Sequence, residues 1–366
     1  THQPAPMNAA KLGKEFDLLR EQPSQVKVMG KFTMTMKEGR AFLTQAKGWM
    51  FTLFLMVLRY YADIPGRLKG SRSRRLTMGN ALSGQLRWSM LERNIDLWLK
   101  SPMTELIEEN GVVVGAVVDH DGTSIRVKAK RGVIIGAGGF EHNQVMREQY
   151  LPQPTSSEWS GSQENNTGDG ILASEKVGAD KALMEHAWWA PSVRIPGWER
   201  PFIIFAERSL PGLVIVNKAG KRFANEAAPY LESGLAFYQA NTPEAPTVPS
   251  HVVFDATFRH KFPFGPIVPG YTMPDGKLSK RIWKVLKKAD TIEELAGLID
   301  VDASALAETV SKNNEYAKTG VDVEFHRGES YYDRYYGDAN NTPNPCIAPI
   351  AKPPFYAIPI HPGDIG

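Results

Sequence analysis

A glycine-rich run, Gly136-Ala137-Gly138-Gly139, follows the apolar residues 133–135. We interpret the apolar residues as a buried strand and the glycines as its end, where the backbone can approach a ligand closely. Nucleotide cofactors bind at the carboxyl ends of strands in this way. A tight turn without a ligand gives the same pattern, so the run alone leaves both interpretations open.

A second candidate segment, Asn166-Thr167-Gly168-Asp169-Gly170, precedes an expected helix over residues 171–177. The N-terminus of a helix offers free backbone N–H groups to an anion or to the polar edge of a ring. Asp169 is the distinctive residue of this segment. Its carboxylate could contact a cofactor or could cap the helix, and the sequence does not decide between the two roles.

A third segment, Asn225-Glu226-Ala227-Ala228-Pro229-Tyr230, follows a turn at residues 218–223 that we place between two strands. A tyrosine can act as a general acid or base when a partner relays its proton. Most loop tyrosines are structural, so Tyr230 is a candidate on residue type alone.

Other chemistries find little support in the chain. The histidines form no H-x-x-x-H pair, and there is no G-x-S-x-G or Walker segment, so we expect no metal site and no acyl-transfer centre. The single cysteine, Cys346, excludes an internal disulfide and favours a reducing compartment. The net charge of +3 is too small to predict a nucleic-acid partner.

These segments need a large folded scaffold, and 366 residues with 42% hydrophobic content allow two domains. Asn110-Gly111 and Asp121-Gly122 predict turns between three strands. The spacing of apolar residues predicts the other helices and strands. A capping box at Thr291 marks the start of one helix, and Gly320 marks the end of another. We expect strands at 95–99, 103–108, 112–118, 125–130, 202–206 and 213–217, helices at 79–93 (with Asn80 as a possible cap), 291–299 and 303–318, and ordered loops over 321–366.

An apolar run covers residues 49–58, about half of the ~20 residues that span a bilayer. It predicts either a buried helix or an amphiphilic flap, near 46–62, that covers an apolar ligand or touches a membrane surface. Five basic residues follow, which we interpret as a solvated face in preference to a phosphate site. They are Arg67, Lys69, Arg72, Arg74 and Arg75.

Together these segments resemble one family, the FAD-dependent 3-ketosteroid dehydrogenases, within the wider group of fumarate reductase and succinate dehydrogenase flavoproteins. The resemblance extends from about Met78 to Gly366. It rests on the three segments above and on Met78-Gly79-Asn80-Ala81-Leu82, Glu141-His142-Asn143, Ala187-Trp188-Trp189-Ala190-Pro191 and Pro354-Phe355-Tyr356-Ala357. The tryptophan pair and the segment ending in Tyr230 are the parts most specific to the steroid branch.

The resemblance implies an α/β fold: a Rossmann-like FAD-binding domain with an inserted α+β catalytic domain. Residues 1–188 would be the central part of the FAD domain, 189–353 the catalytic domain, and 354–366 the start of the return to the FAD domain. The strand with G-x-G-x-x-G that opens such a fold is absent from these 366 residues, as is the family's C-terminal glycine-rich loop with its tyrosine. We therefore expect the chain to be the middle of a longer enzyme and to be inactive by itself.

The resemblance also implies roles for particular residues. Tyr230 matches the tyrosine that removes the proton from carbon 2 of a 3-ketosteroid while the flavin takes a hydride from carbon 1. FAD-contacting positions of the family match Met103, Ala137, Gly138, Gly139, Asn143 and Asp169.

The expected activity is therefore 1,2-desaturation of a 3-ketosteroid with FAD and an electron acceptor of unknown identity. The alternatives are the 4(5α)-dehydrogenase of the same family and a non-catalytic protein that binds an apolar ligand or a membrane surface. The expected location is cytoplasmic, with peripheral membrane contact left open.

Overall fold

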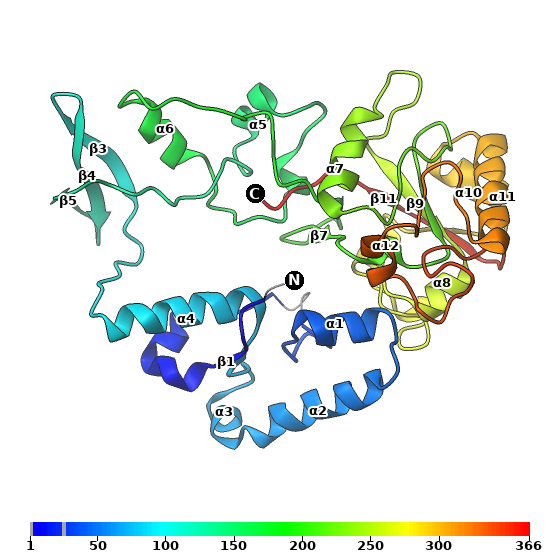
Figure 1. Cartoon of the computed structure of the whole chain (residues 1–366), viewed down its shortest axis with the longest axis horizontal. Coiled ribbons are helices and arrows are strands. Elements are labelled where there is room, and N and C mark those ends of the chain that lie inside the picture. Colours follow the sequence, from blue (N-terminus) through cyan, green and yellow to red (C-terminus); the bar gives the residue numbers. More distant parts are fainter. Residues whose placement is uncertain (1–2, 24–26) are drawn as a thin grey trace. The chain divides into compact units, whose positions relative to one another are not determined.

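The computed structural model describes residues 3–23 and 27–366, which form two compact units, Thr1–Trp98 and Leu99–Gly366. We call them unit 1 and unit 2 and describe each by itself. Figure 1 shows their elements in chain order.

Unit 1 begins with a short antiparallel pair, β1 (Met7–Asn8) with β2 (Arg75–Leu76), beside the 3-10 helix η1 (Ala9–Asp17) and α4 (Met78–Glu92). Met7, Leu12 and Leu76 are buried between them. The predicted helix at 79–93 is confirmed, but Asn80 is not its cap. The N-cap residue is Thr77, and Asn80 instead donates from Nδ2 to the carbonyl of Arg20 at 2.8 Å.

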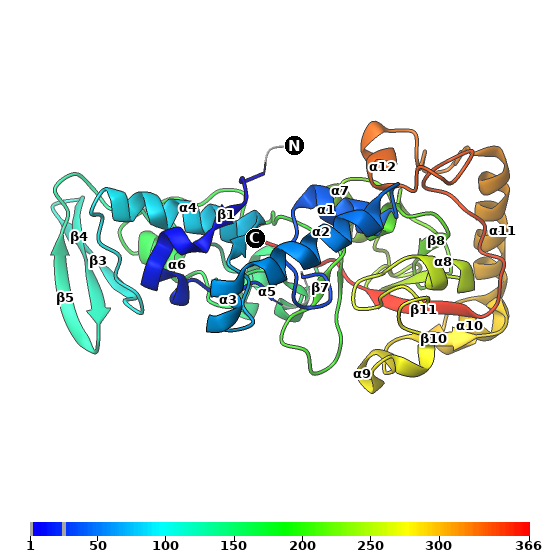
Figure 2. The same cartoon turned by 90° about the horizontal axis from the view of Figure 1, so that it is seen from below.

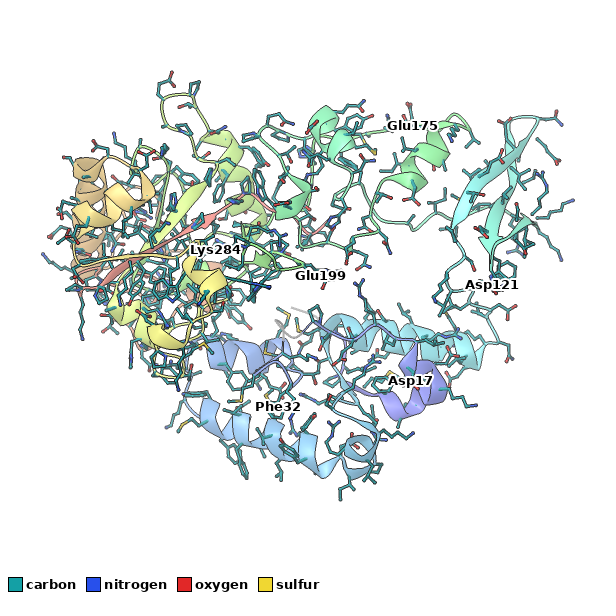
Figure 3. The ribbon with its side chains drawn as sticks, turned by 180° about the vertical axis from the view of Figure 1, so that it is seen from behind. Asp17, Phe32, Asp121, Glu175, Glu199 and Lys284 are labelled. Atoms are coloured by element: carbon teal, nitrogen blue, oxygen red, sulfur yellow. The ribbon has the colours of Figure 1, made fainter. Side chains whose placement is uncertain are left out.

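The rest of unit 1 is α1 (Met36–Leu43), α2 (Trp49–Ala62) and α3 (Ile64–Lys69). Phe32, labelled in Figure 3, packs edge-to-face on Tyr60 at 5.2 Å and lies beside Met56. These three side chains line a cavity of about 440 Å³ that contains none of the predicted site residues.

The interpretation of residues 49–58 as a buried helix is wrong. In the described structure α2 buries only Met56 and Tyr60, because one stripe of the helix meets Phe32 and its neighbours. The opposite side exposes four large apolar residues by half or more: Met50, Phe51, Phe54 and Leu58. No described helix is long and apolar enough to cross a membrane.

Four of the five basic residues are half-buried and make structural contacts, which corrects their interpretation as a solvated face; Lys69 is exposed, as that interpretation predicts. Arg67 donates to the carbonyls of Ser71 and Arg72, and its guanidinium lies 3.7 Å from the centre of the Tyr60 ring. Arg74 pairs with Asp63, and Arg75 with Glu38 at 3.0 Å. These contacts use the cations to close the loop between α3 and β2.

Unit 2 opens with a three-stranded antiparallel meander: β3 (Met103–Glu109), β4 (Val112–His120) and β5 (Thr123–Lys128). The predicted turns are confirmed, because Asn110, Gly111, Asp121 and Gly122 all have positive φ near 51–79°. Both central residues of a type I′ turn require such values. Figure 3 labels Asp121 in the second turn.

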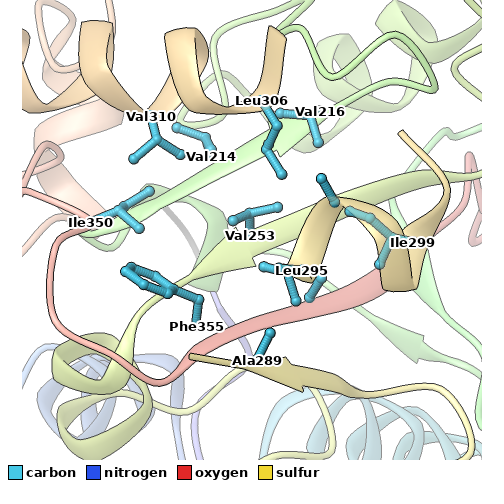
Figure 4. Packing of buried hydrophobic residues seen from close by; sticks show 12 residues of the cluster. Val214, Val216, Val253, Ala289, Leu295, Ile299, Leu306, Val310, Ile350 and Phe355 are labelled. Atoms are coloured by element: carbon cyan, nitrogen blue, oxygen red, sulfur yellow. The ribbon is translucent and has the colours of Figure 1, made fainter. Parts of the chain in front are cut away.

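A second sheet forms the core of unit 2. It is antiparallel, in the order β10 (Lys287–Ala289), β11 (Phe355–Ile360), β9 (Ser250–Phe254) and β8 (Leu213–Val216). Helices α10 (Ile292–Ile299) and α11 (Ala303–Thr319) cover one face, where Leu295 and Leu306 meet the valines of β8 and β9 (Figure 4). The other face holds aromatic rings in contact: Phe254 stacks on Tyr356 and lies tilted against Phe258. Figure 2 shows β11 running beside these helices.

Short elements connect these two sheets. They are α5 (Gln144–Tyr150), η3 (Ser157–Trp159), α6 (Asp169–Glu175), β6 (Ser192–Val193), β7 (Phe202–Ile203), η4 (Glu207–Ser209), α7 (Tyr230–Gln239), α8 (Ala256–Lys261), η5 (Asp275–Lys277), α9 (Lys280–Trp283) and α12 (Tyr331–Tyr336).

Four predictions of local structure are wrong. Residues 133–135 form no strand and Ile134 is 99% exposed, because no strand among the described residues pairs with them. Residues 95–99 are irregular for the same reason. No strand follows the turn at 218–223, since β8 pairs instead with the distant β9. The segment 321–366 contains α12 and the interior strand β11 in addition to loops.

Candidate functional site

Tyr230 is the first residue of α7 and lies in a group of exposed aromatic side chains. The indole N–H of Trp188 donates to its hydroxyl, with Nε1 3.1 Å from the phenolic oxygen. The ring of Phe205 packs edge-to-face on the Tyr230 ring at 5.1 Å. Trp188, Phe205 and Leu231 are all more than two-fifths exposed. The Tyr230 oxygen is therefore bordered by apolar surface that solvent, or a ligand, can reach.

Arg208 of η4 (Glu207–Ser209) ties together the backbone that carries this group. Its buried guanidinium donates to the carbonyls of Phe205 and Ala228, each at 3.1 Å, and to that of Glu226. Burial lowers the pKa of Arg208 to about 10, so the group is still charged at neutral pH. A planar guanidinium can serve several acceptors at once, and here it holds the Phe205 loop against the segment that leads to Tyr230.

Tyr332 of α12 supports Tyr230 from another direction. The hydroxyl of Tyr332 lies close to the backbone of Tyr230. Burial raises the pKa of Tyr332, although the nearby charge of Arg208 acts in the opposite sense. Neither Arg208 nor Tyr332 was predicted as a functional residue. The only sequence signal was the tyrosine-rich run at 331–336, and that run does not indicate that Tyr332 lies beside Tyr230.

The segment before Tyr230 is fixed by a buried ion network. Arg222 pairs with Glu226 at 2.6 Å and with Asp322 at 2.7 Å, and Arg327 lies 3.5 Å from Glu226. Burial alone would raise the pKa of Glu226, but the charges of Arg222 and Arg327 hold it below its usual range. The predicted Asn-Glu-Ala-Ala-Pro-Tyr segment is thus anchored at its glutamate and presents its tyrosine at the surface.

The structure brings the two predicted glycine-containing segments together. The amide of Gly168 donates to the carbonyl of Gly139 at 3.0 Å. Asn143 caps α5 by accepting from the amide of Met146, and its Nδ2 donates to the carbonyl of Thr167 at 2.9 Å. Ala137, Gly138 and Gly139 therefore lie beside the start of α6.

Asp169 does not cap α6, so that interpretation is wrong. The N-cap residue is Gly168, whose positive φ of 79° places it in the left-handed region, and Asp169 is the first helical residue. The Thr167 hydroxyl donates to Oδ1 of Asp169 at 3.0 Å. The second carboxylate oxygen has no such bond among the described contacts, so the side chain retains capacity to accept from a ligand.

Met103, the remaining predicted cofactor residue, begins β3 and pairs with Val118 of β4. Strand β3 contacts α6, which places Met103 in an element next to the other cofactor candidates. A backbone contact with the cofactor would not depend on the side chain, so the identity of residue 103 offers no further test.

The last residues of the chain connect the glycine run to Tyr230. The amide of Trp188 donates to the carbonyl of Gly366 at 2.6 Å, and Ile365 donates to the carbonyl of Trp188 at 3.0 Å. The Glu141 carboxylate lies between, because a Cβ built on Gly139 or Gly366 would be 2.9 or 3.5 Å from its Oε1. The glycine run and the tyrosine are thus parts of one continuous region of unit 2.

This region fits a bound FAD. Residues 136–138 are exposed, and a Cβ at Gly136 would meet no atom within 4 Å, so the backbone is open to a ligand. Glu141 is buried, and its Oε2 has no hydrogen-bond partner in the described part of the chain. A buried carboxylate oxygen without a donor is costly, and a hydroxyl or N–H group of the cofactor would satisfy it.

Comparison with known proteins supports this interpretation. The chain is 38% identical to the 3-oxosteroid 1-dehydrogenase of Mycobacterium tuberculosis (strain ATCC 25618 / H37Rv) over 378 aligned residues, which cover all of this chain and 64% of that protein. It is 36% identical to the 4-oxocyclohex-2-ene-1-carboxylate 5-dehydrogenase of Sinomonas cyclohexanicum, over 79% of this chain and 49% of the relative. The chain therefore spans less than two thirds of the length of these relatives.

A solved structure is also similar. It is the 3-ketosteroid delta1-dehydrogenase of Sterolibacterium denitrificans in complex with 1,4-androstadiene-3,17-dione, with 46% identity and a TM-score of 0.96 over all of this chain and 66% of that one. This match confirms the predicted fold class, and the predicted cofactor, FAD, is confirmed with it. Residues 15–366 match the FAD binding domain family, and the chain belongs to that family of flavoproteins.

Proposed function

We propose that the protein desaturates a 3-ketosteroid between carbons 1 and 2, with FAD as the oxidant. The observation that carries this proposal is the Tyr230 hydroxyl, held by an N–H donor among exposed aromatic side chains. A steroid is a flat, apolar molecule, and such a surface can bury it beside a proton-accepting group. The two 3-ketosteroid dehydrogenases similar to the chain support the same substrate class.

Different residues of this chain would then bind FAD and act on the substrate. Ala137, Gly138, Gly139, Asn143, Asp169 and the backbone of Met103 would hold FAD, which supplies the hydride acceptor when bound. In the same scheme, residues 1–188 and 354–366 belong to the FAD domain, and residues 189–353 to the catalytic domain. This assignment places Tyr230 in the catalytic domain, near the segment that returns to the flavin.

Tyr230 would first release its phenolic proton to solvent and would then, as the phenolate, remove the proton from carbon 2. The carbonyl at carbon 3 acidifies that proton, so the C–H bond breaks, the proton goes to the phenolic oxygen and the electron pair remains on carbon 2. That pair forms the new double bond as the hydrogen on carbon 1 leaves with its own electron pair. A positioned acid–base group of this kind typically contributes about 10²–10⁴-fold to the rate.

The test is Tyr230→Phe, which removes the hydroxyl and keeps the ring that packs on Phe205. In the purified full-length protein we expect flavin content and steroid binding to persist, and flavin reduction by 3-ketosteroid to slow about 100-fold or more. Anaerobic stopped-flow mixing follows the flavin absorbance. Tyr331→Phe is the matched control, because Tyr331 is 82% exposed and its ring contacts that of Tyr335. Reduction of the Tyr230→Phe flavin at the wild-type rate would refute the proposal.

Product analysis separates the alternatives. A 4-ene-3-ketosteroid should give a 1,4-diene, whereas a 4(5α)-dehydrogenase would instead convert a 5α-saturated 3-ketosteroid to the 4-ene. 4-Oxocyclohexanecarboxylate serves as the small-ring comparison. Faster reduction by the small ketone than by the steroid would overturn the steroid assignment but leave the role of Tyr230 intact. A protein without bound flavin or turnover would indicate the non-catalytic alternative.

We also propose a cytoplasmic enzyme whose unit 1 touches a membrane surface containing anionic lipid. The exposed apolar side of α2 carries Phe51 and Phe54. Exposed cations are Lys47 just before α2, Arg59 within α2, which also pairs with Glu38, and Lys69 at the end of α3. Apolar residues with basic neighbours are typical of helices that lie in the membrane interface. The buried free thiol of Cys346 is consistent with a reducing compartment.

Vesicle sedimentation tests the membrane contact. The protein should bind vesicles of mixed phosphatidylcholine and phosphatidylglycerol more strongly than vesicles of phosphatidylcholine alone. Phe51→Ser with Phe54→Ser should abolish binding. Leu183→Ser, which changes an exposed apolar residue of unit 2, is the control. Equal sedimentation of the double variant and the wild type would refute the contact.

A further inference from the structure

The indole N–H of Trp188 donates a hydrogen bond to the Tyr230 hydroxyl, with Nε1 3.1 Å from the phenolic oxygen. An indole N–H can only donate, so the Tyr230 oxygen is the acceptor in this bond. The hydroxyl hydrogen of Tyr230 must then point elsewhere. One lone pair of the oxygen is held, and the remaining directions are open toward the exposed side of the aromatic group.

The backbone at Trp188 is rigid although its side chain is 57% exposed. Residues 188–192 and 361–366 form a ladder of backbone hydrogen bonds, in which Ala190 donates to Gly363 at 2.8 Å and Ser192 and His361 exchange two bonds at 2.9 Å. The next residue, Trp189, is buried with 1% exposure. The indole of Trp188 therefore projects from a fixed support.

Helix α7 is held against the same support at close range. A Cβ built on Gly234 would be 2.7 Å from the Cβ of Trp189 and 3.1 Å from the amide of Ala190, so the helix can approach this closely only with glycine at that position. Gly234 is four residues after Tyr230, and residues i and i+4 lie on one side of a helix. The contact at Gly234 thus sets the distance between Tyr230 and the segment that carries Trp188.

We propose that Trp188 is a positioning residue for proton removal: its N–H aims the Tyr230 oxygen and stabilises that oxygen while it carries negative charge. This inference rests on the proposed function, because it deepens the role of Tyr230. Hydrogen bonds to an ionised oxygen are roughly twice as strong as those between neutral groups. The bond therefore stabilises the ionised form of Tyr230, which accepts the proton from carbon 2, more than the neutral form.

The test compares Trp188→Phe with wild type in the full-length flavin-loaded protein. Phe keeps an aromatic ring and loses the N–H, so flavin reduction by 3-ketosteroid should slow by about 10- to 100-fold, the range for a lost hydrogen bond to a charged group. Trp198→Phe is the matched control, since Trp198 packs on Phe202 and not on Tyr230. It should stay within about twofold of wild type.

Deuterated substrates separate positioning from a general structural effect. With deuterium at carbon 2 or at carbon 1, the Trp188→Phe protein should show a larger isotope effect at carbon 2 relative to carbon 1 than wild type, because proton removal alone has become slower. A merely structural defect would slow both steps and leave that ratio unchanged. A wild-type rate, or a slowed rate with an unchanged ratio, overturns the inference.

A second variant keeps the inference testable if Trp188→Phe loses its fold or its flavin, which the thermal midpoint and the flavin-to-protein ratio report. Trp188→His restores a ring N–H and should recover at least part of the lost rate. A His variant as slow as Tyr230→Phe overturns the inference. If wild type itself is not reduced by steroid, or if Tyr230→Phe is unaffected, the proposed function fails and this inference with it. A slow Tyr230→Phe beside an unaffected Trp188→Phe refutes the inference alone.

Discussion

The buried ion pair between Arg147 and Asp364 should stabilise unit 2 strongly, and Asp364→Asn tests this. Asp364 accepts from Nη1 of Arg147 at 2.7 Å and from the Ser160 hydroxyl at 2.6 Å, and both charged side chains are 0% exposed. Asn keeps the size of the side chain and removes the charge. Breaking a buried pair on one side leaves an uncompensated charge and costs about 3–5 kcal/mol.

The expected shift in thermal midpoint follows from the size of unit 2. For residues 99–366 the unfolding entropy is about 0.6 kcal/mol per kelvin, so a loss of about 3–5 kcal/mol lowers the midpoint by about 5–9 °C. Differential scanning calorimetry of the purified protein measures the shift. Asp300→Asn is the control, because its partner Lys218 is exposed and the midpoint should not move.

A double variant distinguishes charge from packing. Arg147→Met together with Asp364→Asn removes the unpaired cation, so it should be more stable than Asp364→Asn alone. If Asp364→Asn melts within about 1 °C of wild type, the buried pair does not stabilise unit 2 as argued. If the double variant is less stable than Asp364→Asn, the loss of stability does not come from the unpaired charge of Arg147.

The remaining predictions concern the cofactor, pH and packing. Asp169→Ala should lower the flavin-to-protein ratio with little change in thermal midpoint, since Asp169 does not cap α6. An unchanged flavin-to-protein ratio with a lowered thermal midpoint would contradict a role toward FAD. Burial lowers the pKa of His251 and of His361 to about 4. In the unfolded chain these histidines bind their protons near pH 6.5. The free energy of unfolding should therefore fall as the pH is lowered from about 6.5 to 4, by up to about 1.4 kcal/mol per pH unit for each histidine. Urea unfolding measures this pH dependence, and His251→Gln should make it less steep. Gly234→Ala should cost about 1–3 kcal/mol by pushing α7 from Trp189 and should slow flavin reduction. Gly297→Ala in α10, where a Cβ meets nothing within 4 Å, should be neutral or stabilising.

Features with local causes could be predicted from the sequence. The meander turns depend on Asn110-Gly111 and Asp121-Gly122, whose positive φ values are set by residue type. Helix α10 begins where Thr291 accepts from the amide of Glu294, and α11 ends at Gly320 with φ of 78°. Each of these signals lies within four residues of the feature that it determines.

Features that depend on distant partners could not be predicted. Strand β11 contains Pro359 and lies in a proline-rich stretch, yet it pairs with β9, about a hundred residues earlier, and with β10. The apolar residues 133–135 show the converse, because β-branched residues form a strand only beside a partner. The outer side of α2 likewise cannot be read from its composition, since apolar residues occur on every side of the helix and only its packing selects the buried stripe.

The candidate site combines both kinds of information. The sequence places Tyr230 and the glycine run in plausible segments, but nothing in their spacing indicates that they belong to one region.

The connection comes from the backbone of residues 361–366, whose carbonyl at Gly366 is bound by Trp188 and whose Gly363 is bound by Ala190. Glu141, beside both Gly139 and Gly366, continues this contact toward the glycine run. The geometry between the proposed cofactor residues and Tyr230, the proposed proton acceptor, therefore depends on main-chain hydrogen bonds, which any side chains in that segment could make. Side-chain motifs alone could not specify it, and substitutions that disturb this ladder should affect flavin binding and proton removal together.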